Sequence, residues 1–237
     1  MSKKRTNLKF TAPSSVPYEV VRTRRRTLAL YVSHERVEVR CPMRASQREV
    51  REFVQKNHDW INERLREEAE LAGQCMLLEH GGRIFYQSRE LTVVFRESDE
   101  QRVRVTDKQF IMQGHRLTPD KARRMLSEYL IQQANAYLPP RVQALAKHLD
   151  VAHKIKKITL RKTKSKWGHC TEEGVIQFNW LLMLTPYSII DYLITHEVCH
   201  LIHMDHSRRY WRLVHSLCPD TKRYVHWLKE NEHRLWF

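Results

Sequence analysis

The sequence predicts an α+β fold in which a β-rich N-terminal region precedes a mainly helical region. Apolar and polar residues alternate between residues 28 and 41, which is typical of half-buried strands. After residue 117, apolar residues instead recur at helical spacing, and Thr-Pro pairs at 118–119 and 185–186 indicate helix starts. The 237 residues are 41% hydrophobic and 29% charged, so the chain is long and apolar enough to bury a core.

We expect three regions along the chain. Residues 1–17 are basic and polar, and we expect them to form a flexible arm. Residues 18–116 are expected to form the β-rich region, which also contains one long helix. Residues 117–237 are expected to form the helical region. The boundary lies near Gly114 to Thr118, where the strand pattern gives way to the helical one.

The front half is expected to contain strands around one helix. Strand periodicity over 28–32 and 37–41 is followed by Ser46 and Glu49, which match a capping box. Apolar residues behind this cap recur at helical spacing and predict one helix over 46–71. Four shorter strands are expected after it, at 83–86, 91–96, 102–106 and 109–112.

The back half is expected to be mainly helical. Thr118-Pro119 predicts a helix start, and Pro139-Pro140 predict that this helix ends at Leu138, with a second helix continuing to about Asp150. The remaining elements are expected as strands at 155–161 and 175–179 and as helices over 186–200, after Ser207 and over 220–237.

The charge composition bears on binding partners. The chain has 42 Lys and Arg against 27 Asp and Glu, a net charge of +15, which favours anionic partners through long-range attraction. Residues 151–171 hold seven Lys or Arg and no acidic residue, and residues 22–26 form a second basic cluster. These patches could hold acidic peptides or the phosphate backbone of a nucleic acid, and a solvated strand edge protected by lysines is the slightly preferred interpretation.

Other features of the composition bear on location. The longest apolar stretch, residues 180–184, is far shorter than the roughly 20 residues that span a bilayer, so we expect no membrane partner. The first thirty residues show no apolar signal segment, and the five cysteines form no CxxC pair. This pattern suits reduced thiols and predicts a cytoplasmic protein. The sequence does not predict an oligomeric state.

Residues 196–200 read His-Glu-Val-Cys-His and form a candidate metal site. On a helix, His196 and His200 lie one turn apart on the same face, so both rings can reach one metal ion. Glu197 is rotated by about 100° from His196, which places its carboxylate beside the metal, within reach of bound water. The spacing therefore predicts two metal ligands and one general acid/base.

A third ligand is needed to leave one position open for water. His203 and His206 both follow closely. Zinc–nitrogen bonds are about 2.0–2.1 Å long, so one zinc ion cannot easily accept three ligands strung along a straight helix. We therefore prefer His206, which follows the expected turn of the chain, and keep His203 as the alternative.

The residues around this motif follow a recognisable order: Lys166 to Cys170, Asn179, Tyr192, His196 to Leu201 and His206 to Trp211. In this order they resemble the YgjP-like metallopeptidases, part of the wider HExxH zincin class. The likeness is strong around the motif and looser in the β-rich half, and it extends over nearly everything after residue 17. His169, Lys166 and Tyr210 replace a serine, an arginine and a phenylalanine of the family pattern.

The resemblance implies a zincin-like catalytic region over 117–237 and a zinc-dependent metallopeptidase that cleaves peptides or proteins. It implies Zn2+ held by His196, His200 and His206, with zinc-bound water activated by Glu197. Three neutral imidazoles suit this chemistry, because they leave zinc cationic enough to lower the pKa of bound water to about 7. Similarity to the SprT-like and WLM groups adds, by analogy only, a protease associated with nucleic acid.

Several side chains near the motif have more than one interpretation. Tyr210 and His215 are candidate donors to an oxyanion, although helix packing is their ordinary role. Trp167-Gly168 is expected to be a tight turn packed by the indole, and His169 is an extra ligand or proton donor in the alternative interpretation. Ligating histidines usually need a carboxylate or carbonyl partner behind them, and the sequence does not choose among the available carboxylates of Asp191, Asp205 and Asp220.

A different class of function stays open at this point. In it, the chain is a basic nucleic-acid-binding module whose zinc is structural and catalyses nothing. Such a site closes its fourth position with another protein ligand, for which His169, Cys170 and Cys199 are available. Glu197 beside the histidine pair disfavours this alternative. Cys199 is otherwise expected to be a small buried residue.

Overall fold

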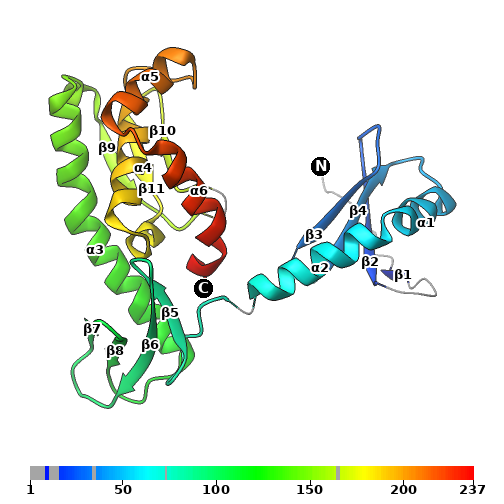
Figure 1. Ribbon diagram of the computed structural model, residues 1–237, viewed down its shortest axis with the longest axis horizontal. Coiled ribbons are helices and arrows are strands. Elements are labelled where there is room, and N and C mark those ends of the chain that lie inside the picture. The colour runs from blue at the N-terminus through cyan, green and yellow to red at the C-terminus, as the bar shows by residue number, and fades with distance from the viewer. Residues whose placement is uncertain (1–8, 11–15, 34–35, 73, 164–165) are drawn as a thin grey trace. The chain divides into compact units, whose positions relative to one another are not determined.

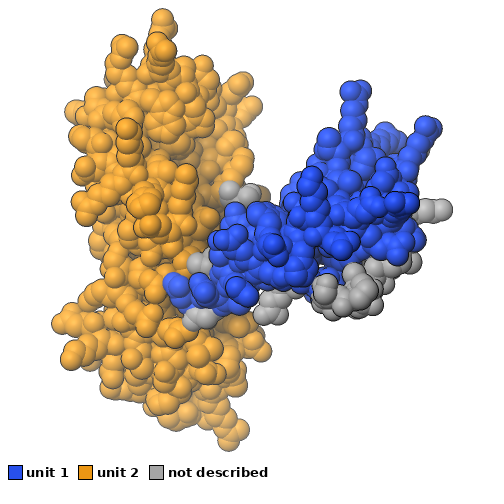
Figure 2. Space-filling model, turned by 45° about the vertical axis from the view of Figure 1, so that its right-hand side comes forward, with its two compact units in different colours: residues 1–74 blue, residues 75–237 orange. Residues whose placement is uncertain are grey.

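The computed structural model describes residues 9–10, 16–33, 36–72, 74–163 and 166–237, so the expected arm lies mostly outside the described residues. The chain forms two compact units, residues 1–74 and residues 75–237, which Figure 2 colours separately. Each unit has its own buried apolar core. Helices and small sheets alternate along the chain (Figure 1), as expected for an α+β protein.

The first unit is a small sheet with two helices. Its strands are β1 (Lys9–Phe10), β2 (Tyr18–Thr23), β3 (Ala29–Ser33) and β4 (Arg36–Pro42), in the order β1-β2-β4-β3. Strand β4 is parallel to β2 and antiparallel to β3. The inward residues of the sheet pack with α1 (Gln47–Lys56) and α2 (His58–Ala72) in one core, formed by Tyr18, Val37, Val39, Cys41, Val50, Val54 and Ile61.

The single helix expected over 46–71 is wrong, because the chain forms two helices there. The predicted cap at its start is present, since Glu49 N donates to Ser46 Oγ and Ser46 N donates to Glu49 Oε2. The break falls at Asn57, whose side chain donates to the Phe53 carbonyl oxygen at 2.7 Å. Asparagine side chains compete in this way for backbone groups, which ends α1 and lets α2 begin at His58.

The second unit begins with a four-stranded sheet. Strands β5 (Arg83–Tyr86), β6 (Arg89–Arg96), β7 (Arg102–Val105) and β8 (Gln109–Gln113) lie in the order β5-β6-β8-β7. All four lie where the sequence predicts strands. Their buried side chains join the same core as the helices that follow. The compact unit therefore begins at Cys75, whereas the sequence placed a boundary near residue 117.

The long helix α3 (Pro119–His148) spans the second unit, with the four-stranded sheet at its N-terminal end (Figure 1). The expected break at Pro139-Pro140 is wrong, because the helix continues through both prolines. A proline inside a helix costs about 3 kcal/mol. Packing outweighs this cost here, since one buried stripe continues on both sides of the prolines, formed by Leu126, Leu130, Ala134, Leu138, Val142 and Ala146.

A three-stranded sheet and the remaining helices complete this unit. Strands β9 (Lys157–Leu160), β10 (Gly168–Cys170) and β11 (Val175–Phe178) lie in the order β10-β11-β9, so β10 is at an edge. The helices are η1 (Ala152–Lys154), η2 (Trp180–Leu184), α4 (Tyr187–Cys199), α5 (Arg208–Leu217), α6 (Thr221–Asn231) and η3 (Glu232–Leu235). None of the described helices is long and apolar enough to cross a membrane.

Candidate metal centre

Helix α4 carries the His-Glu-Val-Cys-His segment through the core. Most of its side chains are buried, and it packs against α3, α5 and α6. The helix ends at Cys199, and the chain tightens there as Leu201 N donates to the Val198 carbonyl oxygen and Ile202 N to the Cys199 carbonyl oxygen, both at 3.0 Å. Lys154 Nζ donates to the Leu201 carbonyl oxygen at 2.9 Å and stabilises this end. The chain therefore turns just after His200, as the choice of His206 requires.

Three imidazole rings meet at this turn. One ring nitrogen each from His196, His200 and His206 lies within 4.8 Å of the others. The Nε2 atoms of His196 and His206 are 3.4 Å apart, so both face the same point. No other group of three or more His, Cys, Asp or Glu side chains in the described part of the chain is close enough to bind a metal ion.

The protonation of these rings suits metal binding. His200 Nδ1 donates to the His203 carbonyl oxygen at 3.1 Å, which leaves Nε2 as the unprotonated nitrogen. Burial lowers the pKa of His200. Burial, with the neighbouring His200 and His206, lowers the pKa of His196 to about 4. Neutral rings are the form that binds metal, so the donor set fits a divalent ion of the zinc type.

His203 thus enters the site through its backbone. Its carbonyl oxygen orients the His200 ring, and its own ring is not part of the three-histidine cluster. The sequence left a carboxylate or a carbonyl open for this orienting role, and at His200 a carbonyl oxygen fills it. Asp191 accepts hydrogen bonds from Tyr137 and Arg141 on α3, and Asp205 accepts one from Ser207 N. His196 Nδ1 is buried without a hydrogen-bond partner among the described residues.

Two aromatic residues of α5 hold the rings in place. Tyr210 is fully buried and donates its hydroxyl to the His196 carbonyl oxygen at 3.1 Å. Its ring stacks on His200 with centroids 4.6 Å apart. Trp211 stacks on His206 at 5.6 Å. Because its hydroxyl is bonded to the backbone, this arrangement favours a role for Tyr210 in positioning the histidine rings over a role as an oxyanion donor.

Glu197 lies beside the histidines in a confined, apolar setting. Its side chain is 3% exposed. Burial raises the pKa of Glu197 to about 8, although the charge of Lys166 opposes this shift. A carboxyl group with a pKa near neutrality can both accept and return a proton at the pH of the cell. The position on α4 and the raised pKa therefore suit acid/base chemistry.

Strand β10 runs directly over Glu197. Gly168 pairs with Phe178 as the first residue of this strand, so the expected tight turn at Gly168 is wrong. A β-carbon at position 168 would stand 2.7 Å from both Cγ and Cδ of Glu197. Carbon atoms in contact normally lie about 3.5–4.0 Å apart. Glycine is therefore needed at position 168, because it lets the backbone of β10 lie close to the Glu197 side chain.

The other candidates lie outside the cluster. His169 is exposed on β10, while Cys170 and Cys199 are buried. Burial raises the pKa of each of these two thiols to about 12. His215 stacks on Trp211 at 5.9 Å. None of these four residues joins the three histidines as a fourth ligand in the described structure.

Part of the basic stretch is used within the fold. Lys154 caps the end of α4. Lys162 Nζ donates to the Phe237 carbonyl oxygen at 2.6 Å and lies over the rings of Phe237 and Trp180. In the other basic cluster, Arg22 donates to the carbonyl oxygens of Met43 and Ala45. Each of these three cations thus makes a hydrogen bond to a backbone carbonyl oxygen within its own unit.

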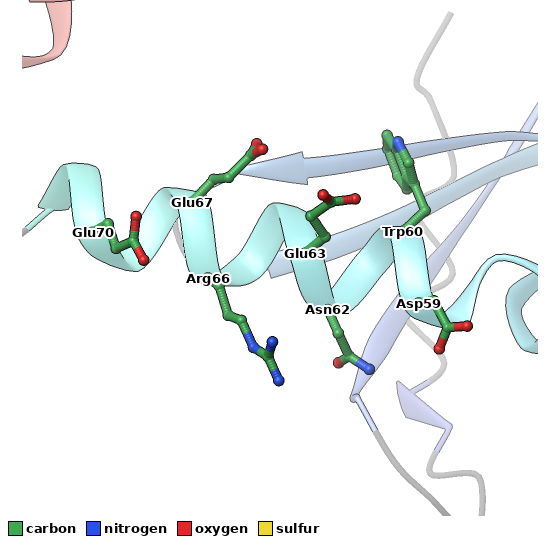
Figure 3. A pocket seen from close by; sticks show the side chains of 7 residues that line it. All are labelled: Asp59, Trp60, Asn62, Glu63, Arg66, Glu67 and Glu70. Carbon is green, nitrogen blue, oxygen red and sulfur yellow. The ribbon is translucent and has the colours of Figure 1, made fainter.

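A hollow lies on α2 of the first unit. It has a volume of about 610 Å³, and its lining comes from a single helix: Asp59, Trp60, Asn62, Glu63, Arg66, Glu67 and Glu70. Figure 3 shows Glu63 and Glu67 on one side of the helix, with Asn62 and Arg66 on the other. Because these side chains diverge, the hollow presents no converging set of polar groups.

The α+β fold and the three-histidine site, with a buried glutamate beside it, define a metallopeptidase-type protein. The model of the YgjP-like metallopeptidase domain matches residues 26–231, and the chain belongs to this family. Among solved structures, it is similar to the metallopeptidase zymogen abylysin of Pyrococcus abyssi, with 17% identity and a TM-score of 0.37. That match covers 41% of this chain and 97% of abylysin. No curated protein sequence matches the chain.

Proposed function

We propose that the chain is a zinc metallopeptidase in which His196, His200 and His206 hold the metal and Glu197 is the general acid/base. The observation that supports this best is the meeting of three imidazoles beside one buried carboxyl group, with burial lowering the pKa of His196 and raising that of Glu197. Imidazole donors accept several divalent ions. Three of them with a fourth position left open match the donor set of catalytic zinc, which is our reason for proposing zinc.

The chemistry follows from the groups at the site. A zinc ion held there supplies a Lewis acid that lowers the pKa of water and polarises a carbonyl group. Glu197 in its ionised form accepts a proton as water oxygen attacks the carbonyl carbon of the substrate. It then donates that proton to the amide nitrogen as the C–N bond breaks. The raised pKa of Glu197 favours its protonated form, which is the form that it has between these two steps.

The structural-zinc alternative has less support. Closing the fourth position with a thiolate requires a cysteine in the cluster, and the cluster consists of histidines among the described residues. A nucleic-acid partner is likewise not favoured, because the internal contacts of Lys154, Lys162 and Arg22 account for part of both basic patches. Peptide or protein is the substrate class we propose.

A cytoplasmic location is also part of the proposal. Cys41, Cys170 and Cys199 are buried free thiols. Free thiols persist in reducing compartments, which supports the cytoplasm. Separating cytoplasmic from membrane and extracellular fractions, with an antibody against the chain, tests this. Recovery outside the cytoplasmic fraction would contradict it.

The decisive experiment compares wild type with Glu197→Gln. We expect both proteins to bind one zinc ion per chain, measured by metal analysis after dialysis. We expect the variant to lose peptide cleavage by at least about 10²-fold, because general acid/base catalysis typically contributes that much. Unchanged cleavage in a zinc-loaded variant would contradict the mechanism. Loss of zinc together with cleavage would show that Glu197 is needed for metal binding instead.

A further inference from the structure

A second cavity lies between α5 and α6, beside the histidine cluster. It has a volume of about 330 Å³, and its lining residues are Trp211, His215, Thr221, Lys222, Val225, His226 and Lys229. Trp211 belongs to both places, because its indole stacks on His206 at 5.6 Å and on His215 at 5.9 Å. One aromatic ring therefore separates the cavity from a proposed metal ligand.

The cavity combines an apolar wall with positive charge. Trp211 and Val225 are half-buried and line it with apolar surface, while Lys222 and Lys229 are exposed. No carboxylate lines the cavity. His226 already pairs with Glu230 at 3.0 Å, whereas neither lysine has an ion pair among the described residues. Residues 207–231 carry six Lys or Arg against two acidic residues, so the surroundings are also basic.

We propose that this cavity is a substrate subsite that selects an acidic side chain, glutamate or aspartate, near the cleaved bond. The proposal rests on the proposed peptidase function. The methylene groups of a glutamate would pack on Trp211 and Val225, and its carboxylate would reach the ammonium groups of the lysines. A carboxylate complements the charge of the cavity, whereas a lysine or arginine side chain is repelled by it.

The distance to the metal site limits which substrate residue can enter. Two successive ring contacts, at 5.6 and 5.9 Å, lead from His206 to His215 at the cavity wall. An extended peptide advances roughly 3.3 Å per residue. The selected side chain therefore belongs to a residue within about three or four positions of the cleaved bond, on one side of it.

Binding of short peptide hydroxamates to the zinc-loaded full chain tests the subsite without relying on cleavage. The hydroxamate anchors each peptide at the metal, and glutamate, glutamine or leucine is placed at the first to the fourth position, with an amidated far end. We expect one position at which the glutamate peptide binds several-fold more tightly than its glutamine counterpart. Exposed ion pairs suggest a factor of about two to five for each lysine.

Variants assign this preference to the cavity. Lys222→Ala together with Lys229→Ala is expected to abolish the preference for glutamate over glutamine while leaving affinity for the glutamine peptide nearly unchanged. Lys108→Ala is the matched control, since it removes an exposed lysine from the turn between β7 and β8 and should keep the preference. An equal preference in the double variant and in wild type would overturn the proposal.

The remaining outcomes are also decisive. Equal affinity for glutamate and glutamine peptides at all four positions, or tighter binding of the leucine peptide, would contradict an acidic subsite. If the preference for glutamate appeared only when the amide at the end opposite the hydroxamate is replaced by a free carboxylate, the cavity would bind the end of a peptide chain instead of a side chain. Wild-type protein that binds the glutamate peptide selectively but cleaves no peptide would contradict the proposed peptidase function and leave the subsite supported.

Discussion

Gly168 and Glu197 are in direct contact, the backbone of the edge strand β10 lying against the side chain of the glutamate on α4. A β-carbon at position 168 would meet Cγ and Cδ of Glu197 at 2.7 Å and would approach Oε1 more closely still. Because the Glu197 side chain is buried on its other sides by the core, it has little room to yield. The absence of a side chain at one strand position therefore decides where the carboxyl group lies.

Gly168→Ala is expected to impair catalysis much more than zinc binding. The added methyl group displaces the Glu197 carboxyl group by roughly 1 Å, and a misplacement of that size costs about 10²-fold in rate. The measurement is kcat on a cleaved peptide, with zinc content and thermal unfolding followed in parallel. Gly114→Ala is the control. A β-carbon at position 114 would have its nearest neighbour at 3.2 Å, and that neighbour is the end of the flexible Leu117 side chain, which can move aside. Equal activity of both variants would show that the contact does not position Glu197.

Zinc content is expected to separate the two downstream histidines. His206→Ala removes a ring that faces His196, so we expect the variant to lose most of its zinc on dialysis. His203→Ala keeps the backbone carbonyl that orients His200, so we expect it to retain zinc. Metal analysis of both purified variants checks this. Zinc loss confined to the His203 variant would mean that the ligand assignment is wrong.

Tyr210→Phe distinguishes a positioning role from a catalytic one. The change removes the hydroxyl bond to the His196 carbonyl oxygen and keeps the ring that stacks on His200. We expect a loss of about 0.5–1.5 kcal/mol in the free energy of unfolding and little change in kcat. A donor to the oxyanion would instead cost about 10²–10³-fold in kcat. Denaturant unfolding and peptide kinetics on the same protein tell the two apart.

Buried and less buried cysteines are expected to differ in how fast their thiols react and in how this rate depends on pH. Burial raises the pKa of Cys170 and Cys199 to about 12, so at pH 8 they are almost wholly in the unreactive thiol form. A raised pKa means that reactivity appears only as pH increases toward that value. Cys218 is less buried, and we expect iodoacetamide to label it before Cys170 and Cys199. Mass spectrometry of native protein, against a denatured control in which all five react, checks this order.

Much of the candidate site was predictable because it depends on local geometry. His196 and His200 share a helix face at any position of that helix in the fold, since four residues make about one turn. His206 was preferred over His203 because a straight helix cannot direct three rings at one point, and α4 does end at Cys199. The strands at 83–113 were also predictable, because their patterns are bounded by turn residues.

The two errors in helix boundaries have different physical causes. Pro139 and Pro140 locally favour a break, yet the buried stripe from Leu126 to Ala146 keeps α3 continuous. Asn57 ends α1 through one side-chain hydrogen bond inside a pattern that suggests an unbroken helix. In the first case packing of the helix in the core outweighs a local preference, and in the second a local side-chain hydrogen bond interrupts a helical pattern.

The sequence by itself determined the chemistry that is available: two histidines and a glutamate in one helix, a further histidine after it, and an excess of positive charge. Only the tertiary structure decided how these groups are held. It supplied the His203 carbonyl behind His200, the Tyr210 ring against the ligands, the bare backbone of Gly168 over Glu197, and the cavity behind Trp211. Helix periodicity acts over a few residues, whereas these contacts join segments that become neighbours only when the core packs.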